Sequence, residues 1–171
     1  MSCMLLAACS GDSRTSSNTA ATVISASKPV LHLLRLADGS ELVVDSGSVV
    51  RVSPNFNLRD RAVYIDGEAL VKPALKSNLP FIVHTRALHI TVLRDSLPAA
   101  FLVSAFSHNN GEEVDVRQGR LLVQKSYPSK TDSAAETVGP REMIMINTEI
   151  DLMEKETADS ATLKKMERFR D

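Results

Sequence analysis

Short runs of apolar residues, each ended within a few positions by Gly, Asn or Pro, recur along residues 31–123. Runs of this length with β-branched side chains and period-two alternation are typical of strands and too short for helices. The sharpest case is Asp66-Gly67, which separates residues 62–65 from 68–71 and suits the two-residue type I′ turn of a β-hairpin. The pattern predicts an all-β fold.

The same reasoning predicts a hairpin of residues 31–36 and 41–44 around Asp38-Gly39. A polar, Pro-containing break at 94–98 predicts a loop or a bulge, and a polar stretch at 127–136 predicts a loop. Further strands are expected at 81–85, 88–93, 101–106, 113–116, 121–123 and 143–146. We therefore expect one compact domain over 31–152, built of short strands and hairpins in a solenoid-like or sandwich-like arrangement.

Composition excludes several kinds of partner. The 171 residues are 43% hydrophobic, enough for one core, and the 20 basic and 21 acidic residues give a formal charge of -1 with no long run of one sign. Aromatic residues make up only 4% of the chain and Trp is absent, which removes the stacking platforms of single-strand nucleic-acid binders. We expect no nucleic-acid partner, and no run is long and apolar enough for a transmembrane helix.

Both cysteines, Cys3 and Cys9, lie at the N-terminus, so no thiol is available to the β domain. Residues 6–9 have the form of a lipobox, and lipidation at Cys9 would anchor the chain to a membrane. Residues 1–9 would then be a truncated lipoprotein-like signal segment and the Ser-, Thr- and Ala-rich residues 10–30 a disordered tether. The leader lacks a basic region and is short, so either translation starts upstream of Met1 or the lipobox is a chance match.

In the tail, residues 153–171, the sequence pattern changes from strand-like to helix-like. Leu163, Met166 and Phe169 recur every three residues among charges, which predicts a short amphipathic C-terminal helix within 157–170. Such a helix either packs on its own domain or docks onto a partner, since it is marginal alone.

No catalytic motif is evident. Gly11-Asp12-Ser13 lies in the predicted tether, and neither a nucleophile elbow nor a phosphate loop is present. His84 and His89 are expected to face opposite ways, which disfavours a metal site. Glu112 and Glu113 are explained by solubility at a turn. We expect no enzyme activity, metal or cofactor.

Three blocks occur in order along the predicted β domain, with Asp38-Gly39-Ser40, Gly67-Glu68-Ala69 and the segment from Pro80 to Thr85. Together they resemble the FecR domain of bacterial cell-surface signalling regulators. The specific blocks are an L-x-D-G-S opening, a central G-E-A turn and a P-F-x-V-x-T segment, followed by a late Gly between apolar pairs. The matching residues are Asp38, Gly39, Ser40, Gly67, Glu68, Ala69, Pro80, Phe81, Val83, Thr85 and Gly119. Most of these positions are expected to hold the fold; Glu68 could instead bind a partner.

The resemblance implies a noncatalytic module of envelope signal relay or sigma-factor regulation. Typical family members add a cytoplasmic sigma-binding segment, a transmembrane helix and a receptor-signalling domain, none of which we identify in the 171 residues. We therefore expect a protein partner in the envelope, either a receptor signalling domain or a transmembrane regulator. The expected location is the periplasm or cell envelope. Membrane contact is expected only through a lipid anchor, which would attach the chain to the outer membrane. The alternative is an envelope structural or ligand-binding lipoprotein scaffold.

Overall fold

The computed structural model describes residues 31–75, 78–94, 97–131 and 134–158, the backbone of 22–25, and the single positions 160, 164, 167 and 169. Thirteen strands are defined in this part of the chain. They are β1 (Thr22–Ser25), β2 (His32–Arg35), β3 (Glu41–Val44), β4 (Val49–Val52), β5 (Ala62–Lys72), β6 (Ile82–His84), β7 (Leu88–Val92), β8 (Ala100–Ala105), β9 (Gly111–Gln118), β10 (Leu121–Lys125), β11 (Glu136–Val138), β12 (Glu142–Asn147) and β13 (Leu152–Thr157).

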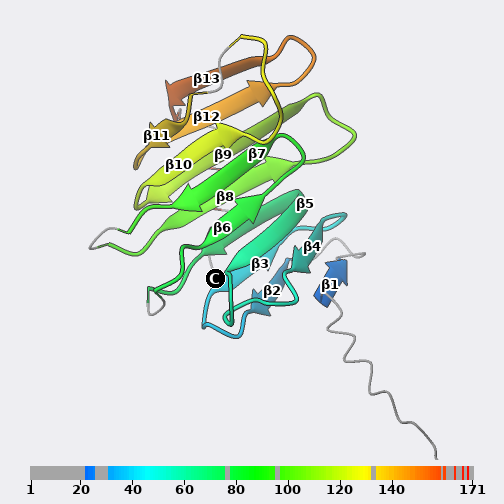
Figure 1. The fold of residues 1–171 in the computed structure, drawn as a ribbon, viewed down its shortest axis with the longest axis vertical. Coiled ribbons are helices and arrows are strands. Elements are labelled where there is room, and N and C mark those ends of the chain that lie inside the picture. The colour runs from blue at the N-terminus through cyan, green and yellow to red at the C-terminus, as the bar shows by residue number, and fades with distance from the viewer. Residues whose placement is uncertain are drawn as a thin grey trace, which may run out of the picture.

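The strands form one hydrogen-bonded sheet that folds over on itself into two layers joined at β5 (Figure 1). Residues 62–66 of β5 pair with β4 and β6, whereas residues 67–72 pair with β3 and β8. We call the layer of β1, β4, β6, β7, β10 and β11 sheet A, and the layer of β2, β3, β8, β9, β12 and β13 sheet B. The strand β5 belongs to both layers.

Beyond β5 the hairpins alternate between layers. The β6–β7 and β10–β11 pairs lie in sheet A, and the β8–β9 and β12–β13 pairs lie in sheet B. Among the thirteen described strands, all pairings are antiparallel except that of β5 with β6. The all-β prediction is confirmed, and the single sheet is nearly closed like a barrel, since β11 of sheet A lies beside β12 of sheet B.

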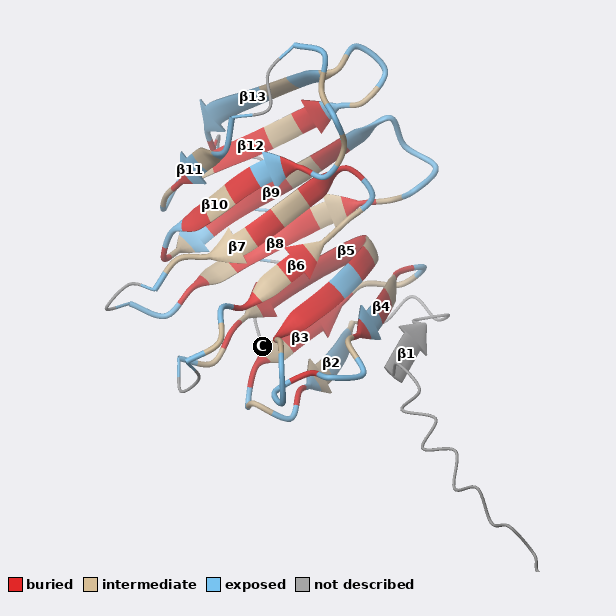
Figure 2. Cartoon of the chain, in the orientation of Figure 1, coloured by how far each residue is buried: buried red, intermediate tan, exposed pale blue. Residues whose placement is uncertain are grey.

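The main core lies between the layers, and buried positions recur along the strands of both (Figure 2). It takes inward residues of both sheets, such as Val44 and Phe101 from sheet B and Val83 and Ile90 from sheet A, all almost fully buried. Burying one such side chain is worth about 1.5–3 kcal/mol. The two layers are thus held mainly by apolar contact, without any cysteine.

The predicted hairpin turn at Asp66-Gly67 is wrong, because β5 runs straight through it. Gly67 has φ of +128°, and a Cβ there would lie 2.3 Å from the Cβ of Ser48. Its role is to let β5 pass close to the β3–β4 connection while the strand moves from sheet A to sheet B. The dipeptide that can turn a hairpin here bends a long central strand instead.

The turn at Asp38-Gly39 is confirmed, with Gly39 at φ +87° between β2 and β3. The further strands expected between residues 81 and 146 are also confirmed, as β6, β7, β8, β9, β10 and β12. The strands β1, β4, β11 and β13 were not predicted. Since β1 pairs with β4, the predicted tether of residues 10–30 contains a strand.

The predicted tail also differs from the structure. Residues 153–157, placed in the helical tail, form most of β13, because they pair in register with the apolar strand β12. The short C-terminal helix is not seen as an element, and most of its residues lie outside the described part. Phe169 is buried against Val43, Leu70 and Leu102 on the outer face of sheet B. At this position the tail packs on its own domain.

Candidate interaction site

A buried ion pair lies at one end of β5. Arg61, directly before the strand, donates from Nε and Nη2 to Oδ2 of Asp38, at 2.7 and 2.5 Å. The two side chains are only 4% and 2% exposed. Ser40 also donates to Asp38, from its hydroxyl at 2.7 Å. A buried charge pair of this kind requires its remaining polar groups to be satisfied.

Arg61 fulfils that requirement through backbone carbonyls of the crossover between β5 and β6. Its Nη2 donates to the Ala74 oxygen at 2.7 Å, and its Nη1 donates to the Leu79 oxygen at 3.2 Å. The guanidinium also lies 5.2 Å from the centre of the Phe81 ring. Arg61 therefore fixes the β2–β3 turn, the start of β5 and the crossover relative to one another.

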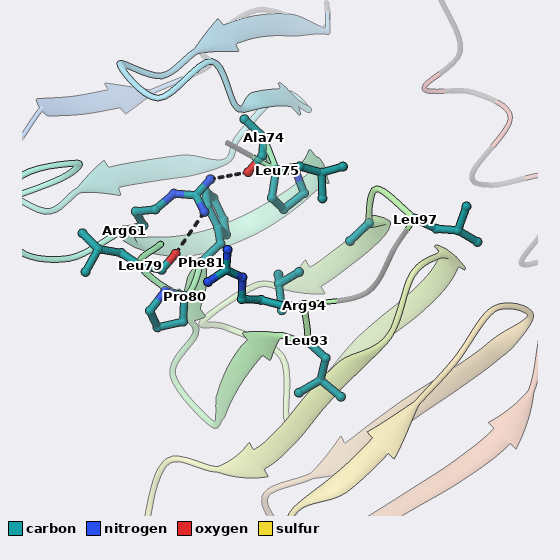
Figure 3. Close-up of a pocket in the computed structure, with 12 residues that line it drawn as sticks. Arg61, Ala74, Leu75, Leu79, Pro80, Phe81, Leu93, Arg94 and Leu97 are labelled. Atoms are coloured by element: carbon teal, nitrogen blue, oxygen red, sulfur yellow. Dashed lines mark hydrogen bonds between the residues drawn. The ribbon is translucent and has the colours of Figure 1, made fainter. Parts of the chain in front are cut away.

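Beside this cluster is a cavity of about 140 Å³ (Figure 3). Arg61 and Phe81 form part of its wall, and most of the remaining lining is apolar. Leu75 and Leu97, at its rim, are 55% and 57% exposed. The other lining residues are Pro73, Ala74, Leu79, Pro80, Val92, Leu93, Arg94 and Ala99. We call this the Arg61 pocket.

The chemistry of the Arg61 pocket suits an apolar side chain. Arg61, the buried cation of the lining, is already neutralised by Asp38 and bonded to carbonyls, so it presents no free charge to an anion. The second cation of the lining, Arg94, is exposed and donates to the main-chain and side-chain oxygens of Asn78 at 3.4 and 3.5 Å. The exposed leucines lie where a partner's apolar residue would cover them. The pocket is thus a candidate contact for a protein partner.

The motif residue Thr85 lies where the β6–β7 turn meets β9. The Thr85 hydroxyl donates to Glu112, and the Ala87 amide donates to the same carboxylate at 3.1 Å. Glu112 is 2% exposed, so the solubility explanation is wrong for this residue. It fails because Glu112 pairs across the two layers with a turn distant in sequence, which adjacency to Glu113 does not reveal.

The remaining predicted site residues lie in surroundings typical of residues that hold the fold. Ala69 and Val83 are fully buried in the core, and Gly119 has φ of +78° with Ala99 against it. Glu68 is 6% exposed and accepts a hydrogen bond from the Ser104 hydroxyl at 3.2 Å. Pro80 and Phe81 contribute to the Arg61 pocket.

His84 and His89 do not face opposite ways, contrary to prediction. They are directly opposed across the β6–β7 pair, with ring centres 4.6 Å apart. Alternation holds along one strand, but opposed residues of two strands share a face. Burial, and secondarily the nearby His89, lowers the pKa of His84. No group of three or more metal-binding side chains occurs among the described residues.

A polar cluster that the sequence did not predict fixes the turn before β13. The buried Lys125 ammonium donates to Oδ1 of Asp151 at 2.9 Å, and Tyr127 donates to the same oxygen at 2.9 Å. The Lys125 bond, with further donors, holds the pKa of Asp151 far below its usual range. Burial and the Asp151 contact raise the pKa of Tyr127. The cluster joins the segment after β10 to the β12–β13 turn.

Cys9, the predicted lipidation site, lies outside the described residues. Over the described part of the chain, no helix is long and apolar enough to cross a membrane. Most motif residues could be identified from the sequence. The role of Arg61, which holds the β2–β3 turn and the β5–β6 crossover together, could not. An arginine placed directly before an apolar strand was the available signal.

No protein-family model matches the sequence, and no curated protein matches it significantly. Solved structures do match. Two crystal structures of a candidate anti-sigma factor from Parabacteroides distasonis, at 2.50 and 1.65 Å resolution, share 25% and 26% identity with TM-scores of 0.73 and 0.72. They cover 88% and 86% of this chain, which spans 66% and 65% of theirs. The fold therefore agrees with the regulators that the sequence resembles, although no family match confirms the FecR domain.

Proposed function

We propose that this chain is a noncatalytic, FecR-like protein-binding module that regulates sigma-factor signalling through a partner in the bacterial envelope. The observation that supports it is the shared architecture with a candidate anti-sigma factor over 88% of the chain at a TM-score of 0.73. Among the residues that resemble the FecR domain, Pro80 and Phe81 line the Arg61 pocket, and Asp38 and Ser40 bond to Arg61 behind it.

In this proposal the Arg61 pocket is the partner contact. Covering Leu75 and Leu97 with an apolar side chain would contribute about 1.5–3 kcal/mol for each well-buried residue. The rigid network behind the pocket supports such a contact, because Arg61 holds the crossover through the Ala74 and Leu79 carbonyls. Little ordering would then be needed on binding.

The proposed location is the envelope, with Cys9 lipidated. The test is growth of the native bacterium with a clickable fatty acid, followed by detection of label on the protein. Label on the wild type and none on Cys9→Ser supports the anchor. Label on neither protein contradicts it, and the regulatory proposal does not depend on the result.

The regulatory proposal is tested by deletion of the gene in its native bacterium and transcript sequencing. The expected result is a change in one set of genes under a single sigma factor, reversed by the wild-type gene. A deletion that leaves every sigma-dependent set unchanged under stimulation of each envelope receptor would overturn the proposal. Such a result would favour the alternative function, an envelope structural or ligand-binding lipoprotein scaffold.

A further inference from the structure

The strand β13 ends sheet B, and its outward face is acidic. It pairs with β12 alone among the described strands and is the longest of the four strands with a single neighbour. Met145 is opposite Glu154, and Met143 is opposite Glu156, so both carboxylates lie on one face of the sheet. Glu154 and Glu156 are exposed.

A groove of about 660 Å³ lies on the same face, across β9, β12 and β13. Its lining includes Glu154 and the apolar residues Met145, Ile150 and Leu152, and it contains no Lys or Arg. Ile150 and Leu152 are among the exposed large apolar residues of the protein. The groove lining is therefore apolar with acidic groups and no cation. Lys155, between the two glutamates, is opposite the buried Ile144 on the other face and pairs with Glu142 at 3.8 Å.

In the registers centred on Glu154 and on Lys155, pairing of β13 with a second copy of itself is disfavoured by this charge pattern. Two antiparallel strands related by a twofold axis oppose residues of the same face. A register centred on Glu154 opposes two Glu154 side chains, and a register centred on Lys155 opposes Glu154 to Glu156. Like charges directly opposed across strands are destabilising. Acidic residues thus protect the edge against its own copy.

We propose that β13 receives an extended strand from the regulatory partner, with Lys or Arg at alternate positions next to Glu154 and Glu156. This inference rests on the proposed function, of which it specifies a second contact, separate from the Arg61 pocket. Main-chain hydrogen bonds to the open edge would supply affinity, and the acidic row would select basic partners. An apolar residue beside the basic ones would cover Leu152 at the groove.

The probe is a short capped peptide in which Lys and Val alternate, titrated into the isotope-labelled full chain and followed by amide NMR shifts. Shifts concentrated in β13 and β12 are expected. A peptide with Glu in place of Lys, and one with its backbone N-methylated along one edge, are both expected to fail. These two peptides separate the charge requirement from the strand-pairing requirement.

The matched variants are Glu154→Lys/Glu156→Lys and, as a control, Glu136→Lys on the edge strand β11 of sheet A. Reversal of both β13 charges is expected to weaken binding about tenfold or more, and the β11 change to have little effect. Circular dichroism and the urea midpoint establish that each variant is folded.

The proposal would be overturned by shifts located away from β13, by equal binding of the N-methylated peptide, or by equal binding to the charge-reversed variant. Self-association of the wild type that the charge reversal abolishes would also overturn it, since β13 would then bind its own copy. The deletion experiment is independent. A changed sigma-dependent gene set together with no peptide binding would leave the regulatory proposal standing and remove only strand addition.

Discussion

Gly67 packs so closely against Ser48 that a Cβ on the glycine would lie 2.3 Å from the serine Cβ. The Ser48 hydroxyl also accepts a hydrogen bond from the Glu68 amide at 2.8 Å, directly beside the glycine. This contact fixes where β5 leaves sheet A and enters sheet B. The passage of one strand through both layers depends on it.

Gly67→Ala is therefore expected to lower the free energy of unfolding by about 2–5 kcal/mol, from the left-handed backbone and the overlap together. Gly39→Ala is the control, because Gly39 also has a positive φ but a Cβ there would meet only Ala74 at 3.9 Å. It should cost about 1 kcal/mol. Urea denaturation measures both, and equal losses would contradict the close-contact explanation.

Arg61→Met is expected to destabilise the fold by about 3–5 kcal/mol, because it leaves Asp38 buried without its counter-ion. Arg35→Met breaks an exposed ion pair with Glu41 and should cost no more than about 1 kcal/mol. Chemical denaturation of Arg61→Met, Asp38→Leu and the double variant measures the coupling. Strict additivity of the two single changes would contradict the ion-pair account.

Asp151 should make the fold sensitive to acid. Its folded pKa is depressed, so the stability it contributes is complete above its unfolded pKa of about 4 and is lost as the pH falls from there toward the folded value. Asp151→Asn should be less stable than the wild type at neutral pH, and the difference should shrink below about pH 4. Urea midpoints across this range test it. A constant difference would exclude the carboxylate's ionisation as the cause.

His84 should remain neutral to a lower pH than an ordinary histidine. Because its folded pKa is lowered, the unfolded chain binds the proton more readily, and stability falls as the pH drops below about 6.5 until the folded pKa is passed. His89→Gln removes one of the two lowering causes, so the NMR-measured pKa of His84 should rise. An unchanged value would contradict the influence of His89.

Asp38-Gly39 and Asp66-Gly67 show how far local turn chemistry predicts this fold. The same dipeptide forms a hairpin turn in the first case and lies inside β5 in the second. A two-residue hairpin at Asp66-Gly67 would have placed Glu68 opposite Ile65, on the face of the core. Continuous alternation of Val63, Ile65, Ala69 and Val71 toward the core was the signal for a single strand.

Contacts between distant segments could not be predicted from local patterns. Glu112 meets Thr85 across 27 residues, and Arg61 reaches Asp38 across 23. Phe169 packs against strands more than 60 residues away in the chain. The strands could be predicted because strand formation depends on neighbours in sequence. The candidate site could not, because it depends on which layer each strand joins.

The central claim is that the Arg61 pocket is the contact through which this chain regulates a sigma factor. It is tested most directly by complementing the gene deletion with Leu75→Glu/Leu97→Glu and measuring transcripts of the affected gene set. Leu58→Glu is the control, because Leu58 is 80% exposed and lies outside the pocket. We expect the Leu58 variant to restore wild-type expression and the equally abundant pocket variant to fail. Full restoration by the pocket variant would contradict the claim.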